Sequence, residues 1–83
     1  MSKYIQESNG QRFEIDIAPI PGGPGPLFGA RIARIENSCR VRLTMSPDGR
    51  HEVYGPSESW ALASARAILR AGAWREEDVA VPA

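Results

Sequence analysis

The sequence predicts an α+β fold, in which an antiparallel sheet of four or five strands forms a meander and one C-terminal α-helix packs on one face. Residues 39–45 alternate between apolar and polar side chains, and residues 12–17 do the same, which is the period of a half-buried strand. Residues 57–72 instead have the spacing of an amphipathic helix, and they follow the strands. Runs of strands followed by a helix are typical of α+β domains with antiparallel sheets.

The length, charge and hydropathy of the chain limit the classes of protein to which it can belong. The 83 residues correspond to a single domain, residues 1–83. Ten basic side chains balance ten acidic ones, whereas dedicated nucleic-acid or membrane-surface proteins usually carry a large positive excess. No apolar run reaches about 18 residues and residues 1–4 lead directly into polar sequence, so neither a membrane span nor a signal peptide is expected. We therefore expect a soluble, cytoplasmic protein with no membrane partner.

A β-hairpin is predicted at the start of the chain, followed by a long loop. Residues 3–6 and 12–17 are its strands, and Asn9-Gly10 suits a type I′ turn because both residue types tolerate positive φ. Residues 19–26 contain four prolines and three glycines, which excludes a helix or a central strand. Because the tip of this loop carries no side chain suited to chemistry, a spacer is favoured over a mobile binding loop.

Three further strands are expected at residues 27–35, 39–45 and 50–54, joined by turns at residues 36–38 and 46–49. In the first of these strands the alternation is lost near Ala33 and Arg34, which indicates either a bulge or an end that is apolar on both faces. Cys39 falls on the apolar side of its strand, so we expect it to be a buried small residue rather than a nucleophile.

The helix predicted over residues 57–72 has recognisable ends. Ser57 is a suitable N-cap, and Gly72 is the residue expected in the left-handed conformation at the C-terminal end. One apolar stripe would pack on the sheet, formed by Ala61, Leu62, Ala65, Ile68 and Leu69. Residues 75–83 are acidic and then weakly apolar, so we expect a flexible tail.

No catalytic, cofactor-binding or metal site is expected. His51 is the only histidine and Cys39 the only cysteine, which is too few for a typical zinc site. Nothing in the pattern fixes a Ser–His or Cys–His pair in space. The glycines of residues 19–26 lack the Gly-Lys-Ser/Thr ending of a phosphate-binding loop. We therefore expect a protein that is not an enzyme; catalysis would require His51 to lie in a cleft beside a carboxylate.

The cations are nine arginines and one lysine. If the strands at 27–35 and 39–45 pair, Arg31, Arg40 and Arg42 share the outer face of the sheet, while Arg66 and Arg70 lie together on the helix. Guanidinium groups bind phosphate well, so these five arginines are candidate contacts to nucleic acid. No aromatic side chains are interleaved with them as a base-stacking platform, which favours a solvated sheet face instead.

Two tryptophans flank the helix and are candidates for an interface. Trp60 lies at its start and Trp74 just past its end, and large apolar side chains on a small protein often anchor an interface. The alternative is that both cap the ends of the core. A small sheet with one helix also leaves one face and two edges free, so self-association is expected.

The passage from the last strand into the helix carries a resemblance. Residues 54–61 read Tyr-Gly-Pro-Ser-Glu-Ser-Trp-Ala, with Gly55 and Ser57 at the step and Ala61 and Ala65 as small helix positions. This resembles short bacterial proteins of unknown function built as a β-meander plus a C-terminal helix, and the partial RNase-H-like domain of HicB antitoxins. The antitoxin resemblance implies a toxin partner and no catalysis.

These observations lead to one expected function and one alternative. We expect a small non-enzymatic protein–protein interaction module that self-associates, with a homodimer or another protein as its partner and no cofactor. The alternative is a nucleic-acid-contacting or HicB-like antitoxin domain that uses an arginine-rich sheet face.

Overall fold

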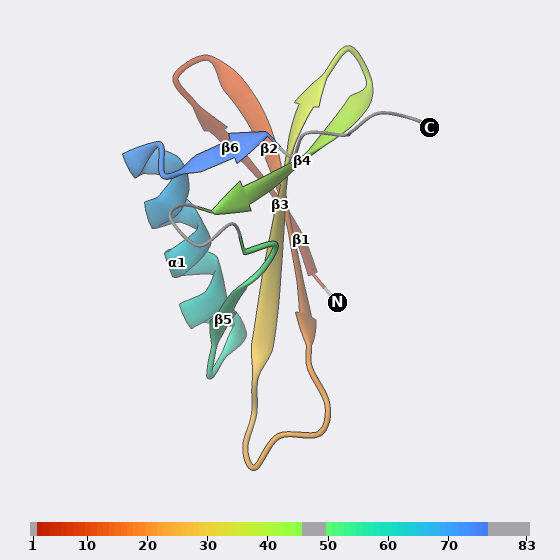
Figure 1. Ribbon diagram of the computed structural model, residues 1–83, viewed down its shortest axis with the longest axis vertical. Helices are drawn as coiled ribbons and strands as arrows, with labels where there is room; N and C mark the ends of the chain where they lie inside the picture. Colours follow the sequence, from red (N-terminus) through yellow and green to blue (C-terminus); the bar gives the residue numbers. More distant parts are fainter. Residues whose placement is uncertain (1, 46–49, 77–83) are drawn as a thin grey trace.

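The computed structural model describes residues 2–45 and 50–76. Its six strands form an antiparallel sheet that carries a single described helix on one face, which confirms the predicted α+β fold (Figure 1). The strands are β1 (Ser2–Ser8), β2 (Gln11–Pro19), β3 (Phe28–Glu36), β4 (Cys39–Met45), β5 (Val53–Gly55) and β6 (Trp74–Glu76), and the helix is α1 (Glu58–Ala71). The order across the sheet is β1-β2-β3-β4-β6, and β5 pairs with β3.

Two hairpin turns have both central residues at positive φ. Asn9 and Gly10 have φ of 52° and 77° in the β1–β2 turn, as the type I′ prediction requires. Asn37 and Ser38 have φ of 51° and 65° in the β3–β4 turn, which therefore adopts the same form without a glycine. The loop between β2 and β3 is closed by a hydrogen bond of 2.8 Å from Ile20 N–H to the Leu27 carbonyl.

Strand β3 is regular where a bulge was one of two expectations. Its register against β2 is unbroken from Arg12 opposite Ile35 to Pro19 opposite Phe28. Consecutive residues from Ile32 to Arg34 are buried on both sides of the sheet, but the buried set includes the charged Arg34, so this stretch is not simply apolar on both faces.

The sheet forks on the far side of β3. Strand β4 pairs with β3 over Ala33–Glu36, and β5 pairs with it over Phe28–Ala30, so Arg31 and Ile32 pair with neither strand. The predicted strand over residues 50–54 is thus shorter than expected and lies beside β3, with one bridge between Met45 and Arg50. The predicted turn at residues 46–49 lies outside the described residues.

Helix α1 packs on the sheet by the predicted stripe. Ser57 accepts a hydrogen bond of 3.2 Å from Trp60 N–H, and Gly72 ends the helix at a φ of 67°. Ala61, Ala65 and Leu69 are fully buried. They complete a core of apolar side chains from the three strands β2, β3 and β4, namely Phe13, Ile15, Ile17, Ala30, Ile32, Leu43 and Met45. The small alanines let the helix axis approach the sheet closely.

Strand β6 corrects the prediction of a flexible tail over residues 75–83. Arg75 and Glu76 belong to this strand, which pairs with the last three residues of β4. The side chain of Arg34 forms an ion pair and hydrogen bond with Glu76, and this long-range contact gives no local sequence signal. Residues 77–83 lie outside the described part of the chain.

The prediction that Cys39 is buried is wrong. The residue is exposed at the first position of β4, opposite Glu36 and next to the turn. This end of the hairpin projects away from α1 (Figure 1), so the helix does not cover its apolar side.

Candidate functional site

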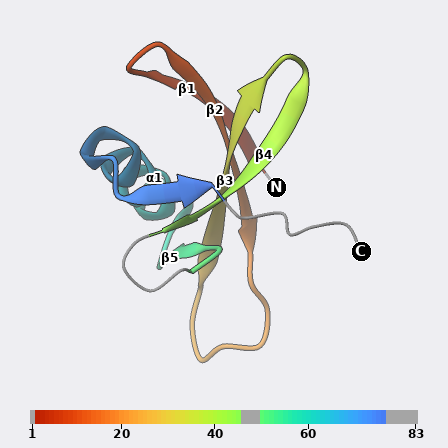
Figure 2. The ribbon, with the colours of Figure 1, turned by 45° about the horizontal axis from the view of Figure 1, so that its top comes forward.

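Helix α1 packs on one side of the sheet (Figure 2), and three arginines lie on the other side. Ala33 and Ile35 of β3 stand opposite Arg42 and Arg40 of β4, and Arg31 precedes Ala33 by two residues. Side chains alternate along strands, so Arg31, Arg40 and Arg42 point to the same side, which we call the open face. The shared face expected from the sequence is therefore present.

The open face also supplies carboxylates to these cations. Arg40 forms an ion pair with Glu14, whose side chain is only 11% exposed, and Lys3 Nζ lies 3.6 Å from the same carboxylate. Arg31 Nε lies 3.4 Å from Glu52 Oε2. A phosphate group approaching this face would have to compete with carboxylates that are already held there.

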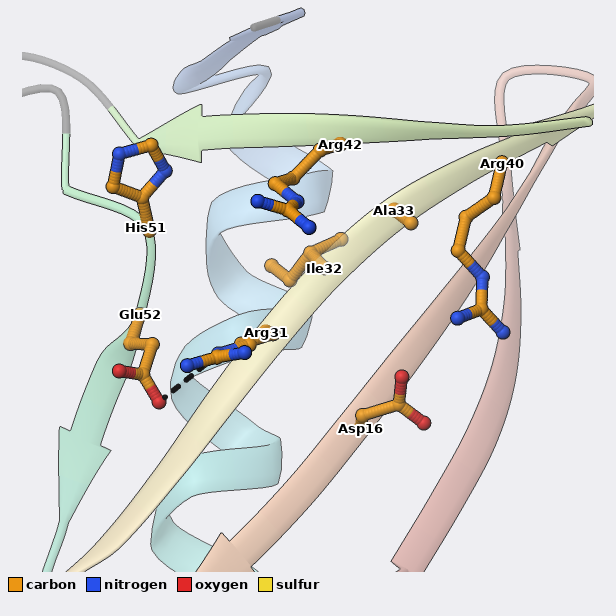
Figure 3. Close-up of a pocket in the computed structure, with 8 residues that line it drawn as sticks. All are labelled: Asp16, Arg31, Ile32, Ala33, Arg40, Arg42, His51 and Glu52. Carbon is orange, nitrogen blue, oxygen red and sulfur yellow. Dashed lines mark ion pairs between the residues drawn. The ribbon is translucent and has the colours of Figure 1, made fainter.

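A hollow of about 510 Å³ lies on this face at the fork between β4 and β5. Figure 3 shows the side chains that line it, which are Asp16, Arg31, Ile32, Ala33, Arg40, Arg42, His51 and Glu52. Asp16 Oδ1 is buried without a hydrogen-bond partner among the described residues. The lining mixes three guanidinium groups with two carboxylates, an arrangement that suits a ligand carrying charges of both signs better than a simple anion.

His51 and Glu52 line this hollow together, which was the arrangement named above as necessary for catalysis. The Glu52 carboxylate is turned toward Arg31 (Figure 3) and also accepts a hydrogen bond of 3.5 Å from the Tyr54 hydroxyl. It is therefore engaged by other partners. Over residues 2–45 and 50–76, no three His, Cys, Asp or Glu side chains are placed to hold a metal ion.

The five candidate arginines do not form one surface. Arg66 and Arg70 belong to α1 and lie on the opposite side of the sheet from the other three. Arg70 is exposed in the last turn, where a cation favours the helix dipole. Arg66 is half-buried, and its Nε has no hydrogen-bond partner in the described part of the chain. A nucleic acid lying on one face of the sheet would contact only one of these two groups.

The two tryptophans have different surroundings. Trp74 is half-buried, and its ring meets that of Phe13 edge to face with 5.3 Å between centroids. Trp60 is 60% exposed and lies against Gly55 at the start of α1. Trp60 therefore presents apolar surface to solvent, whereas Trp74 extends the core.

The free edge strand β1 was not among the sites predicted from the sequence. Its seven residues pair with β2 in an unbroken register, and no other described strand pairs with its outer side. Ile5, at its centre, is 52% exposed, and Lys3 and Glu7 flank it on the same face. The signal available in the sequence was this short alternation of residue types, which the analysis assigned to a partner strand of the hairpin.

Contacts to α1 hold β1 in place. Glu58 accepts hydrogen bonds from the Tyr4 hydroxyl and, at 2.9 Å, from Ser2 Oγ. The hydrogen bond to Glu58 raises the pKa of Tyr4, and the hydrogen bond from Tyr4 lowers the pKa of Glu58. These side-chain hydrogen bonds join the first half of β1 to the first turn of α1.

No protein-family model, curated protein or solved structure matches this chain. Within the described residues, α1 lacks the length and apolar character needed to cross a membrane.

Proposed function

We propose that this protein is a small non-enzymatic protein–protein interaction module that self-associates through the free edge of its sheet. The observation that carries the proposal is β1, a seven-residue edge strand with an exposed isoleucine at its centre. Unpaired N–H and C=O groups along such an edge are a template for another strand. A second strand would satisfy those groups and cover the isoleucine.

Edges of natural sheets are usually protected, and most protective devices are missing from β1. The strand contains no proline, and its register against β2 shows no bulge. Its two charged residues, Lys3 and Glu7, have opposite signs, so they do not repel an approaching strand as a run of like charges would. This edge therefore favours pairing.

The alternative is a nucleic-acid-contacting or antitoxin-like domain, and one observation favours it. Arg31, Arg40 and Arg42 share the open face, as a phosphate-binding surface would require. The ion pairs with Glu14 and Glu52 reduce the positive potential of that face, and Arg66 and Arg70 lie on its far side. These contacts make self-association the better supported function.

Sedimentation or size-exclusion measurements over a wide range of concentrations test the proposal. We expect the apparent mass to rise from that of one chain toward that of two. The mass of one chain at every concentration would refute self-association. A gel shift with single-stranded and double-stranded nucleic acid separates the alternative, because phosphate binding would weaken steeply with added salt.

A further inference from the structure

We propose that two copies of the protein join β1 to β1 in antiparallel orientation, with Ile5 on the two-fold axis. This inference rests on the proposed self-association and adds the partner strand and its register. Such an interface is isologous, since the same seven residues serve on both sides.

The backbone of β1 directs alternate residues toward the free edge. In the β1–β2 turn, the Ser8 carbonyl faces the Gln11 N–H across the type I′ turn, so Ser8 bonds to β2. Because hydrogen bonding alternates along an antiparallel strand, Gln6, Tyr4 and Ser2 also bond toward β2. The N–H and C=O groups that face outward therefore belong to Lys3, Ile5 and Glu7.

The side chains of these same three residues are complementary under a two-fold axis through Ile5. Ile5 then stands opposite the partner's Ile5, Lys3 opposite the partner's Glu7, and Glu7 opposite the partner's Lys3. Each of these positions exchanges backbone hydrogen bonds, and the two ion pairs flank an apolar centre. A shift of two residues in either direction places Ile5 opposite a charge and leaves one outward residue beyond the partner strand.

The surroundings of β1 suit this register. Lys3 is 56% exposed and lies 3.6 Å from Glu14, so its ammonium group can also reach a carboxylate across the axis. An axis perpendicular to the sheet places both helices on one side of the joined sheet, and Tyr4 then stands opposite the partner's Gln6 on that side. The hydrogen bonds of Ser2 and Tyr4 to Glu58 hold the edge in its paired conformation, which reduces the ordering cost of association.

The other free edges of the described sheet are shorter than β1. Strand β4 leaves only residues 39–42 unpaired on its outer side, and strands β5 and β6 have three residues each. Three residues provide too few outward backbone groups for a stable strand pairing. The exposed Trp60 is a single side chain against Gly55 and carries no comparable complementarity.

A charge-swap mixture tests the register. Lys3→Glu and Glu7→Lys each place like charges opposite one another at two positions of the dimer, so each variant alone should associate roughly tenfold more weakly than the natural chain. In the mixture, every cross-axis contact again unites opposite charges, so heterodimers should form with nearly the natural affinity. Effects within one chain, such as loss of the Lys3–Glu14 contact, are equal in the single and mixed samples and cancel.

Cross-linking provides the matched geometric test. In a Cys39→Ser background, which removes the exposed natural thiol, Ile5→Cys should form a disulfide-linked dimer on mild oxidation. Directly opposed residues lie about 5.5 Å apart between Cα atoms, within the range that a disulfide spans. The control is Gln6→Cys, which stands opposite Tyr4 and should remain monomeric on a denaturing gel.

The outcomes separate the register from the function. A natural chain that dimerises, while neither the mixture nor Ile5→Cys responds as described, refutes this register and leaves self-association in place. Equal cross-linking of Ile5→Cys and Gln6→Cys also refutes it. A natural chain that never dimerises overturns both proposals. Circular dichroism of each variant establishes that it is folded before its association is compared.

Discussion

The two faces of the sheet are stabilised in different ways. Beneath α1, side chains such as Ile15, Ile17 and Leu69 exclude water completely, and contacts are apolar. On the open face, Arg31 and Arg40 are held by carboxylates that are distant in the sequence, and much of each guanidinium-bearing side chain remains in solvent. Burial of apolar area contributes far more free energy than exposed ion pairs do. The covered face therefore determines stability, and the open face and its edge are free to determine what the protein contacts.

Truncation of the covered face should have the largest effect. Leu69→Ala removes a fully buried side chain between α1 and the sheet, and should lower the free energy of unfolding by about 2–5 kcal/mol. Chemical denaturation followed by circular dichroism measures the change. Arg70→Ala, one residue later and exposed, should change the same quantity by less than about 0.5 kcal/mol. Equal losses in the two variants would contradict the distinction between the faces.

A side chain added at Gly55, where β5 meets the start of α1, should cause the next largest loss of stability. A Cβ atom on Gly55 would lie 2.5 Å from Trp60 Cδ1 and 3.0 Å from Ala61 N, so the helix start would have to move. Gly55→Ala should therefore cost about 1–3 kcal/mol in thermal or chemical unfolding. Restored stability in the Gly55→Ala, Trp60→Ala double variant would identify the indole as the obstacle. A double variant as unstable as the single one would instead point to the backbone of Ala61.

The contribution of each ion pair on the open face to the free energy of unfolding should increase with the burial of the pair. Glu14→Gln leaves Arg40 without the carboxylate that holds it, and that carboxylate is nearly buried, so the loss should be about 1 kcal/mol. Arg31→Gln breaks a pair in which the arginine is 68% exposed, and should change stability by less than about 0.5 kcal/mol. The same unfolding measurement compares them. A larger loss of stability in Arg31→Gln than in Glu14→Gln would mean that the residues lining the hollow between β4 and β5 contribute to the fold.

The smallest effect should be a change in how the stability of the fold depends on pH, caused by the contact between Tyr4 of β1 and Glu58 of α1. The pKa of Glu58 is lowered in the folded state, so its contribution is present above the unfolded pKa and is lost as the pH falls through the folded one. The pKa of Tyr4 is raised above 10.0, so its contribution is lost as the pH rises through the folded value.

Tyr4→Phe should therefore reduce the acid loss of stability and remove the alkaline one, as measured by urea unfolding across pH. The control is Tyr54→Phe, whose hydroxyl lies at 3.5 Å from Glu52 on an exposed side chain, and which should keep the natural profile. An unchanged profile for Tyr4→Phe would show that the contact with Glu58 is not formed in solution.

Local patterns predicted most of the fold. The Asn9-Gly10 turn, the caps at Ser57 and Gly72 and the strand over residues 39–45 each depend on neighbouring residues, and the structure confirms them. Strand β6 was not predicted because three residues have no readable period, and their position is set by distant contacts with β4.

The candidate site was predicted only in part for the same reason. Alternation placed three arginines on one face, yet their carboxylate partners come from β2 and from the segment before β5. Alternation also cannot show where a covering layer ends, which is why Cys39 was expected to be buried. That β1 is an edge strand follows from the strand order, in which no other described strand pairs with its outer side, and not from its own residues.

The position of β6 has a consequence for synthesis of the chain on the ribosome. Strands β1 to β4 can pair as soon as they emerge, but the outer side of Leu43–Met45 stays bare until the final described strand has followed α1 into place. During that interval the growing polypeptide exposes a second unpaired strand edge, which β6 covers in the folded protein. Deletion of residues 74–76 would make this interval permanent, and the shortened product should aggregate.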